Sequence, residues 1–485
     1  MSEQIIHRAA RVTDARAAMP WLVAAGIYAL LIALAPRLLA DPDTYSHIAL
    51  GRWIFDHHAV PTADPLSLTM RGTPWIAFEW GSQVVYAAAY ALGGWLAVVA
   101  IAAAAAAAAF GQLTRFLLRT WQPMPVIIAV LAALVLVSPH ILARPHVLAL
   151  PLLVTWVASL IQAAEERRAP SWWLLAIMVL WANLHGSYSF GLAMIVPIAC
   201  EALWSAPPAE RMRVARQWIL FAALALAAAC CNPYGPEMIL VTFRTAALGT
   251  ALSTITEWRP QDFSHLAGYE LIMLAGFAVA LYRGVRLPFW RLVMVFGVLH
   301  LSLSQQRHAD LLGLLAPLLI AKPLAEQFAA LAASRDVESA RSGVIIPAAA
   351  IALLIAITGL SAERHDIAPA ADITPANALK AIDLAKAGPI LNDYDFGGYL
   401  DFVGIAPFID GRGELYGAAF INRYSRDLNL QNIPDFQRLL DEYKIETTLL
   451  SPSTPAVALL DRLPGWRRVY ADDVAVVHQR VKPRK

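Results

Sequence analysis

The chain has 485 residues, of which 58% are hydrophobic and only 15% are charged, and its mean hydropathy is +0.54. A soluble domain typically has about 45–50% apolar and about 25% charged residues. The composition therefore excludes a disordered chain, a coiled coil, a collagen-like chain and a typical soluble enzyme. The formal net charge of +2 gives no reason to expect a nucleic-acid partner, and three cysteines are too few for a disulfide framework. These numbers indicate a membrane protein with many spans.

Apolar segments that approach the length needed to cross a bilayer recur between Trp21 and Leu360. One further apolar stretch, Gln83–Leu92, ends at the pair Gly93-Gly94, and we interpret it as the start of a longer second helix or as an interfacial helix. The first segment is long enough to span, so it is not interpreted as a cleavable signal peptide. We predict about eleven transmembrane helices, at 20–40, 94–113, 123–138, 146–163, 171–184, 188–204, 217–231, 267–281, 289–303, 309–321 and 343–361.

Basic residues orient these spans, because cytoplasmic loops carry an excess of arginine and lysine. The N-terminal segment and every second loop have this excess, which places the N-terminus in the cytoplasm. An odd number of spans then puts the C-terminus outside, and we expect a multi-pass protein of the bacterial cytoplasmic (inner) membrane. The residues concerned are Arg8, Arg11, Arg16, Arg115, Arg119, Arg167, Arg168, Arg211, Arg213, Arg216, Arg283, Arg286, Lys322, Arg335 and Arg341.

The composition changes after Ser361 and becomes rich in Asp, Lys, Asn and Arg. Short segments alternate between helical and extended patterns, which predicts a small α/β domain on the outer, periplasmic side. We therefore divide the chain into a transmembrane region, 1–361, and a C-terminal domain, 362–485. The predicted helices lie near 376–387, 418–430, 434–443 and 454–461, and the predicted strands near 389–393, 406–410, 446–450, 466–470 and 474–479.

The outer loops carry carboxylates, histidines and single arginines. The first of them, 41–93, is long and opens with Asp41-Pro42-Asp43. Ionisable groups at a membrane edge are costly, so they usually face a cavity and indicate a functional site. We therefore expect a polar cavity that opens outward. Its candidate residues, from five loops, are Asp41, Asp43, His47, Glu79, Arg144, His185, Glu257 and Arg307.

The segment DPDTYSHIALGRWIFDHHAVPTADPLSLTMRGTPWIAFEWGSQ, from Asp41 to Gln83, resembles the first external loop of the GT-C superfamily. These polytopic glycosyltransferases use lipid-phosphate-linked sugars and include protein O-mannosyltransferases, aminoarabinose transferases and oligosaccharyltransferase catalytic subunits. The sequence is most like a bacterial branch with the tail motifs NDYDFGGYL and FIDGR, here Asn392–Leu400 and Phe408–Arg412. It has no WWDYG-type sequon-reading motif, which argues against transfer to asparagine.

The resemblance implies an inverting transfer of a sugar from a polyprenyl-phosphate carrier to an acceptor on the outer face of the membrane. Such a reaction needs a carboxylate to accept the proton of the acceptor. We assign this role to Asp43, with Asp41 assisting or, together with Asp43, holding a divalent metal such as Mg or Mn. For the phosphate we favour Arg307 and then Arg144, because a guanidinium makes bidentate contacts with phosphate oxygens.

The other candidates have open roles. His47 follows Asp43 by four residues, so on a helix the two share a face; it could bind phosphate, help to hold a metal or hydrogen-bond Asp43. His185 lies in a very tight turn between two spans. Glu79 and Glu257 each precede a tryptophan, which is typical of an interfacial anchor or of a sugar-stacking site. All four are retained as candidate substrate contacts, beside structural roles.

Two other functions remain open. A glycan ligase or polymerase would move a whole glycan from a pyrophosphate-linked carrier. A transporter or flippase would be non-enzymatic, but the absence of an internal repeat and the one-sided polar residues disfavour it. The partners that we expect are a lipid-linked sugar donor, a glycan, lipid or protein acceptor and the membrane lipid.

Overall fold

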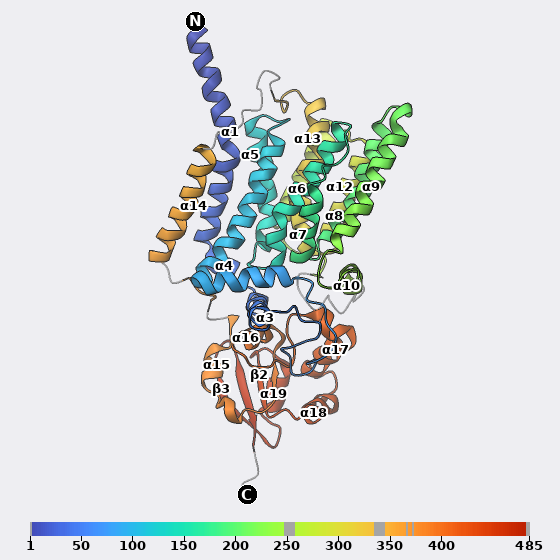
Figure 1. Cartoon of the computed structure of the whole chain (residues 1–485). Helices are drawn as coiled ribbons and strands as arrows, with labels where there is room; N and C mark the ends of the chain where they lie inside the picture. The colour runs from blue at the N-terminus through green and yellow to red at the C-terminus, as the bar shows by residue number, and fades with distance from the viewer. Residues whose placement is uncertain (1, 247–257, 334–344, 365–366, 371–372, 482–485) are drawn as a thin grey trace.

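In the computed structural model a bundle of long helices stands on a smaller α/β part, and the two ends of the chain lie at opposite ends of the molecule (Figure 1). The structure describes the whole chain except residues 1, 247–257, 334–344, 365–366, 371–372 and 482–485. The α/β part lies beneath the first outer loop and the kinked start of the second long helix (Figure 1). This junction contains most of the residues that the sequence singles out.

Each of the eleven predicted spans is a helix in the described part of the chain. Eight of the helices there are long and apolar enough to cross a membrane, which indicates a multi-pass membrane protein. Helices α7, α11 and α12 are shorter, so the count of eleven spans remains a prediction. The helices are α1 (Ser2–Ala33), α4 (Trp80–Leu117), α5 (Pro123–Val137), α6 (Pro145–Glu165), α7 (Leu174–Leu184), α8 (Tyr188–Ser205), α9 (Arg211–Ala229), α11 (Gly268–Arg283), α12 (Phe289–Ser304), α13 (Ala309–Gln327) and α14 (Ile345–Arg364).

Helix α4 has a sharp kink at the glycine pair. Gly94 has φ 59° and ψ −150°, a backbone conformation that a residue with a Cβ rarely adopts. The first half of α4 lies across the end of the bundle, and the second half runs along it (Figure 1). Gln83–Leu92 therefore lies in the first part of the longer helix α4, and the position of this part across the end of the bundle also agrees with the interfacial interpretation.

The first outer loop is well structured. It contains α2 (Ala35–Leu38) and α3 (Asp43–His57), followed by an irregular stretch that reaches α4. Helix α3 is wedged between α4 and the C-terminal part of the chain. A methyl group added to Gly51 would overlap Gln83 of α4, and one added to Gly398 would overlap the carbonyl of Pro42. These two glycines therefore allow the backbones to approach closely on both sides of α3.

An ion cluster fastens the bundle at the end away from α3. Arg291 of α12 is 1% exposed and lies 2.7 Å from Glu201 of α8 and 3.0 Å from Glu165 of α6. It also donates a hydrogen bond of 3.2 Å to the carbonyl of Leu319 on α13. Because a buried cation needs such partners, this cluster is interpreted as structural.

The C-terminal part is built on a four-stranded sheet with the order β1-β2-β4-β3. The first two strands are parallel, and the other neighbouring pairs are antiparallel. This mixture of strands and helices agrees with the predicted α/β character. The elements are β1 (Ile390–Asn392), β2 (Thr447–Leu450), β3 (Trp466–Ala471), β4 (Val476–Arg480), α15 (Ala376–Lys380), α16 (Gly397–Phe402), α17 (Gly413–Leu428), α18 (Ile433–Glu442) and α19 (Pro455–Leu460). In the fourth outer loop lies α10 (Glu237–Ala246), and short 3₁₀ turns are η1 (Ser138–His140), η2 (Pro208–Glu210), η5 (Gln306–His308), η7 (Leu384–Lys386) and η8 (Tyr394–Phe396).

The predicted strand at 406–410 is wrong. Asn392, at the end of β1, forms hydrogen bonds through its side chain with the backbone of this segment. Its Oδ1 accepts from the amide of Phe408 at 2.6 Å, and its Nδ2 donates to the carbonyl of Ile409 at 2.8 Å. These backbone groups are thus paired without a strand ladder. The segment forms a loop that continues directly into Asp410–Arg412.

Candidate active site

Arg144 joins the two aspartates of the acidic motif. Its Nη1 lies 3.0 Å from Asp41 Oδ2, and its Nη2 lies 3.0 Å from Asp43 Oδ2. The side chains are 19%, 12% and 25% exposed in the order Arg144, Asp41 and Asp43, so all three are partly shielded but can be reached. Asp41 Oδ1 also accepts a 2.8 Å hydrogen bond from the amide of Asp43. Three of the predicted site residues therefore meet at one point.

Main-chain contacts hold the segment before α6 against the acidic motif. The amide of Ala143 donates to the carbonyl of Leu38 at 2.7 Å, and the hydroxyl of Thr44 donates to the carbonyl of Ala143 at 3.1 Å. Tyr86 of α4 donates to the carbonyl of Arg144 at 3.0 Å. These bonds fix where the guanidinium of Arg144 can reach. The pairing of Arg144 with the aspartates is thus built into the backbone.

A loop of the C-terminal part closes against the same carboxylate. A methyl group added to Gly411 would overlap Asp43 Oδ1, so this carboxylate rests on the backbone of Gly411. Gly411 lies in the Phe408–Arg412 motif, whose role the sequence left open. Both tail motifs pack against the first outer loop, because Gly398 of the other motif meets Pro42. The C-terminal part therefore forms one wall of the site.

Buried ion pairs hold this loop in place. Arg412 lies 2.6 Å from Asp64 of the first outer loop and 2.6 Å from Asp410. Tyr416 donates to Asp410 at 2.8 Å, and both aspartates are nearly inaccessible to solvent. A buried guanidinium with two carboxylate partners fixes geometry strongly, because removal of one partner leaves an unpaired charge. Residues on both sides of Gly411 are therefore immobilised.

A second polar group surrounds Glu79. His185 Nε2 lies 3.3 Å from Glu79 Oε1, and His47 Nε2 lies 4.0 Å from Glu79 Oε2. The amide of Ser187 donates to His185 Nδ1 at 3.1 Å, so the ring proton is on Nε2 and is directed to Glu79. Burial, helped by Arg144, lowers the pKa of His47 to about 3, and burial lowers the pKa of His185 well below its ordinary value. Both imidazoles are neutral at physiological pH.

Arg307 lies at the edge of this group. Its guanidinium is stacked on Trp258, with Cζ 4.5 Å from the ring centroid. It is also an electrostatic neighbour of His185, as is Arg144. His185 is therefore close to both predicted phosphate ligands. Glu257, the remaining candidate, lies outside the residues that the structure describes.

The sequence reasoning missed two residues of η8. Tyr394 has Asp43 and Arg144 among its electrostatic neighbours, and burial raises its pKa well above the ordinary value, so its hydroxyl remains a hydrogen-bond donor. For Asp395, burial followed by neighbouring carboxylates, Asp41 among them, raises the pKa to about 6. Both residues lie in the NDYD motif. That motif was the available signal, but it gave them no role.

The shifted pKa of Asp395 predicts a pH-dependent effect on stability. The ionised carboxylate is disfavoured in the folded protein above about pH 6, and this cost is absent below the ordinary value of 3.8. We expect Asp395→Asn to increase the free energy of unfolding by about 1 kcal/mol at pH 8, after allowance for solvent screening, and to leave it unchanged near pH 4. Denaturant unfolding at the two pH values, with the exposed Asp473→Asn as control, measures this. Destabilisation at pH 8 would contradict it.

The described residues do not form a metal site. No three His, Cys, Asp or Glu side chains are grouped in the described chain so that they could hold a metal ion. Asp41 and Asp43 each direct one oxygen to Arg144, which supplies the opposite charge. The divalent metal therefore stays a prediction.

Neither a protein family model nor a curated protein matches the sequence. The structure is similar to oligosaccharyltransferase AglB from Archaeoglobus fulgidus in complex with an inhibitory peptide and a dolichol-phosphate, with 12% identity, a TM-score of 0.52 and coverage of 89% of this chain and 69% of that chain. The apo form of the Archaeoglobus fulgidus oligosaccharyltransferase gives 13% identity, a TM-score of 0.53 and the same coverage. The same oligosaccharyltransferase tethered with an acceptor peptide containing the NVT sequon gives 13% identity, a TM-score of 0.53 and coverage of 89% of this chain and 68% of that chain. At this identity the similarity concerns the fold alone, and the chain therefore has a fold similar to that of the Archaeoglobus fulgidus oligosaccharyltransferase.

Proposed function

We propose that the protein is a GT-C-type glycosyltransferase that moves a sugar from a polyprenyl-phosphate carrier to an acceptor on the outer face of the bacterial cytoplasmic membrane. One observation carries the proposal. Asp43 lies at the junction of the helix bundle and the α/β part, fixed by Arg144 at 3.0 Å and seated on Gly411. A lipid-linked donor from the bundle side and a polar acceptor from the outer side can meet at this carboxylate.

The structural neighbours support this choice of donor and leave the acceptor open. One of them holds a dolichol-phosphate, and another is tethered to an acceptor peptide. A donor with a phosphate on a long isoprenoid is consistent with the fold that the two proteins share. This chain has no WWDYG-type motif, so we do not transfer the sequon acceptor to it. A glycan, a lipid or a protein remains the acceptor class.

Asp43 acts as the general base in this proposal. It accepts the proton of the acceptor hydroxyl as the oxygen attacks the anomeric carbon of the sugar. The bond between that carbon and the phosphate oxygen breaks, and the electron pair leaves with the polyprenyl phosphate. Because the displacement is single, the anomeric configuration is inverted. Arg144 holds Asp43 Oδ2, so we now assign it to orienting the base and no longer to the phosphate.

The remaining groups act on the donor and the acceptor. Arg307 stabilises the charge of the leaving phosphate, as a preorganised cation near the site. The neutral imidazole of His185 and the carboxyl group of Glu79 supply hydrogen bonds for the sugar or the phosphate. The protonated hydroxyl of Tyr394 donates to the acceptor from the side of the α/β part. His47 packs beside Glu79 and helps to position it.

Transfer by the purified protein tests the proposal. The protein, reconstituted in lipid, is incubated with a labelled polyprenyl-phosphate sugar or, in a parallel arm, with a pyrophosphate-linked oligosaccharide. We expect transfer and release of polyprenyl phosphate only in the arm with the polyprenyl-phosphate sugar. The reason is that the leaving group of the proposed reaction carries a single phosphate and not a pyrophosphate. We also expect activity to persist in EDTA, since Arg144 provides the cation for the two aspartates.

Three outcomes of this assay would contradict the account. Transfer from the pyrophosphate carrier alone would indicate a ligase or polymerase. No transfer from either carrier with a broad set of acceptors would favour a non-enzymatic role. Loss of activity in EDTA that Mg or Mn restores would establish a divalent metal and would contradict the view that Arg144 provides the positive charge that the two aspartates need for activity.

A further inference from the structure

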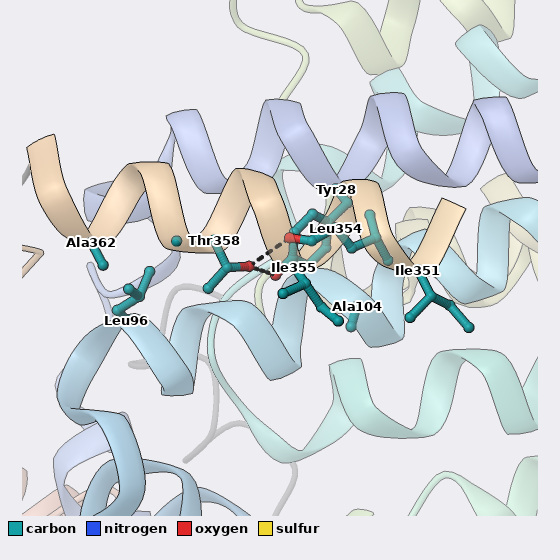
Figure 2. A pocket seen from close by; sticks show the side chains of 9 residues that line it. Tyr28, Leu96, Ala104, Ile351, Leu354, Ile355, Thr358 and Ala362 are labelled. Carbon is teal, nitrogen blue, oxygen red and sulfur yellow. Dashed lines mark hydrogen bonds between the residues drawn. The ribbon is translucent and has the colours of Figure 1, made fainter. Parts of the chain in front are cut away.

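A groove of about 500 Å³ between α1, α4 and α14 has no part in the proposed reaction (Figure 2). Leu96 and Ala362 lie at one end of it, and Ala104 and Ile351 lie toward the other (Figure 2). All three helices are long and apolar enough to cross a membrane. The groove therefore extends along the hydrocarbon region of the bundle, starting just after the kink of α4.

The lining of the groove is almost entirely apolar and therefore suits a hydrocarbon chain. Its two hydroxyl groups satisfy each other, because Tyr28 and Thr358 are 2.6 Å apart and Thr358 also donates to the carbonyl of Leu354 (Figure 2). A site without unpaired polar groups does not hold water. Ile351 and Ile355, both of α14, are 53% and 68% exposed, so this wall also borders the surrounding lipid. An apolar chain can enter from the bilayer.

A positive charge lies near the outer end of the groove. The guanidinium of Arg52 is 4.9 Å from the ring centroid of Tyr90 and 4.4 Å from that of Phe402. Trp95, which precedes Leu96 of the groove, packs against both rings, at 4.9 Å and 5.7 Å. Tryptophan and tyrosine side chains, here Trp95 and Tyr90, concentrate at the level of the lipid headgroups, where the phosphates lie. Arg52 is thus placed at the depth of a lipid phosphate.

This charge is separate from the candidate active site. Arg52 follows Asp43 by nine residues on α3. At about 100° per residue, nine residues place two side chains about half a turn apart, on opposite faces of the helix. A phosphate bound at Arg52 therefore differs from the donor phosphate, which the proposed reaction places beside Asp43. The occupant is expected to be a lipid of the bilayer.

We infer that the groove and Arg52 together bind one membrane phospholipid. One acyl chain lies in the groove between α1, α4 and α14, and the phosphate pairs with the guanidinium of Arg52. The charge of the phosphate complements Arg52, and the length of the groove runs inward from it. The bound lipid fills the gap beside α14, the helix that connects the bundle to the α/β part.

Native mass spectrometry after release from nanodiscs of phosphatidylglycerol tests this inference. Gly359 borders the groove, and a Cβ added there meets no atom within 4 Å, so Gly359→Leu introduces a side chain at the groove from a position with free space. We expect the wild type to retain one phosphatidylglycerol and Gly359→Leu to weaken retention about tenfold, because space for about two CH₂ groups is lost. The control is Gly276→Leu on α11, where a Cβ also meets no atom within 4 Å.

The same measurement tests whether the charge of Arg52 binds the lipid phosphate. Arg52→Gln should weaken retention about tenfold, whereas Arg71→Gln, in the same outer loop, should not change it. Equal retention of the lipid by Gly359→Leu and Gly276→Leu would contradict the claim that an acyl chain lies in the groove. If the wild type carries no phospholipid, or carries polyprenyl phosphate instead, the claim that the bound lipid is a membrane phospholipid is contradicted. The readout is bound lipid mass, so it is independent of whether sugar transfer is observed.

Discussion

The Asp43→Asn variant is expected to transfer sugar about 10³-fold more slowly than the wild type, because the amide cannot accept the proton of the acceptor. The amide oxygen can still accept from Arg144, and Asp41 keeps its own bond of 3.0 Å to the same guanidinium. We therefore expect a folded protein with unchanged affinity for the donor. Single-turnover rates and donor binding, measured on the same preparation, separate the two effects.

The matched control is Asp56→Asn. Asp56 lies on the same helix, α3, but is exposed to solvent. Its replacement removes one negative charge near the membrane surface without touching the site, so the rate should stay within about twofold of the wild type. An Asp43→Asn variant as active as Asp56→Asn would show that Asp43 is not the general base and would contradict the proposed mechanism.

The Gly411→Ala variant is expected to slow transfer about 10²-fold, although Gly411 carries no functional group. The new methyl group would overlap Asp43 Oδ1, so either the carboxylate or the loop must move. The loop is held by Arg412, which pairs with Asp64 at 2.6 Å, and we expect the carboxylate to shift. Misplacement of a catalytic group by about 1 Å can cost a factor of about 100.

A helical glycine with free space serves as the control for this variant. A Cβ at Gly297 meets no atom within 4 Å, so Gly297→Ala should leave the rate unchanged. Thermal unfolding of both variants shows whether the fold is kept. A Gly411→Ala protein with wild-type rate would mean that the C-terminal loop does not determine the position of Asp43. A rate loss that only follows a loss of folded protein would mean the same.

The membrane part of the fold could be predicted because its cause is local. A long apolar run must form a helix in a bilayer, since its backbone groups have no other partners. The predicted segments are therefore helical in the described part of the chain, and eight helices there are long and apolar enough to cross a membrane. The pair Gly93-Gly94 lies at the kink of α4. The strand predicted at 406–410 was wrong because the side chain of Asn392 binds the backbone there, a contact that no periodicity reveals.

The candidate site was predictable in its residues but not in its pairings. Asp41, Asp43 and Arg144 were chosen for their types and their side of the membrane. That Arg144 binds the aspartates depends on Leu38 and Ala143 meeting across a hundred residues of chain, which the sequence does not encode locally. His47 follows Asp43 by four residues on α3, as the spacing predicted, and its Nε2 lies 4.0 Å from Glu79, a neighbour that the spacing did not indicate.

The contribution of the C-terminal part depends on still longer contacts. Gly411 and Asp43 are brought together by the ion pair of Arg412 with Asp64 and by the hydrogen bond between Ser46 and Asp401 at 2.9 Å. Charged residues within an α/β domain usually face solvent, so their types gave no sign of this contact. Its consequence is that two parts of the chain, far apart in the sequence, form one candidate active site.

A double-mutant cycle on Asp43 and Gly411 tests this central claim most directly. Single-turnover rates of sugar transfer are measured for the wild type, Asp43→Asn, Gly411→Ala and the double variant. If the loop acts by placing the carboxylate, Gly411→Ala has no further effect once the base is gone, and the double variant is as slow as Asp43→Asn alone. If the two losses multiply, the loop acts independently of Asp43, and the composite site is contradicted.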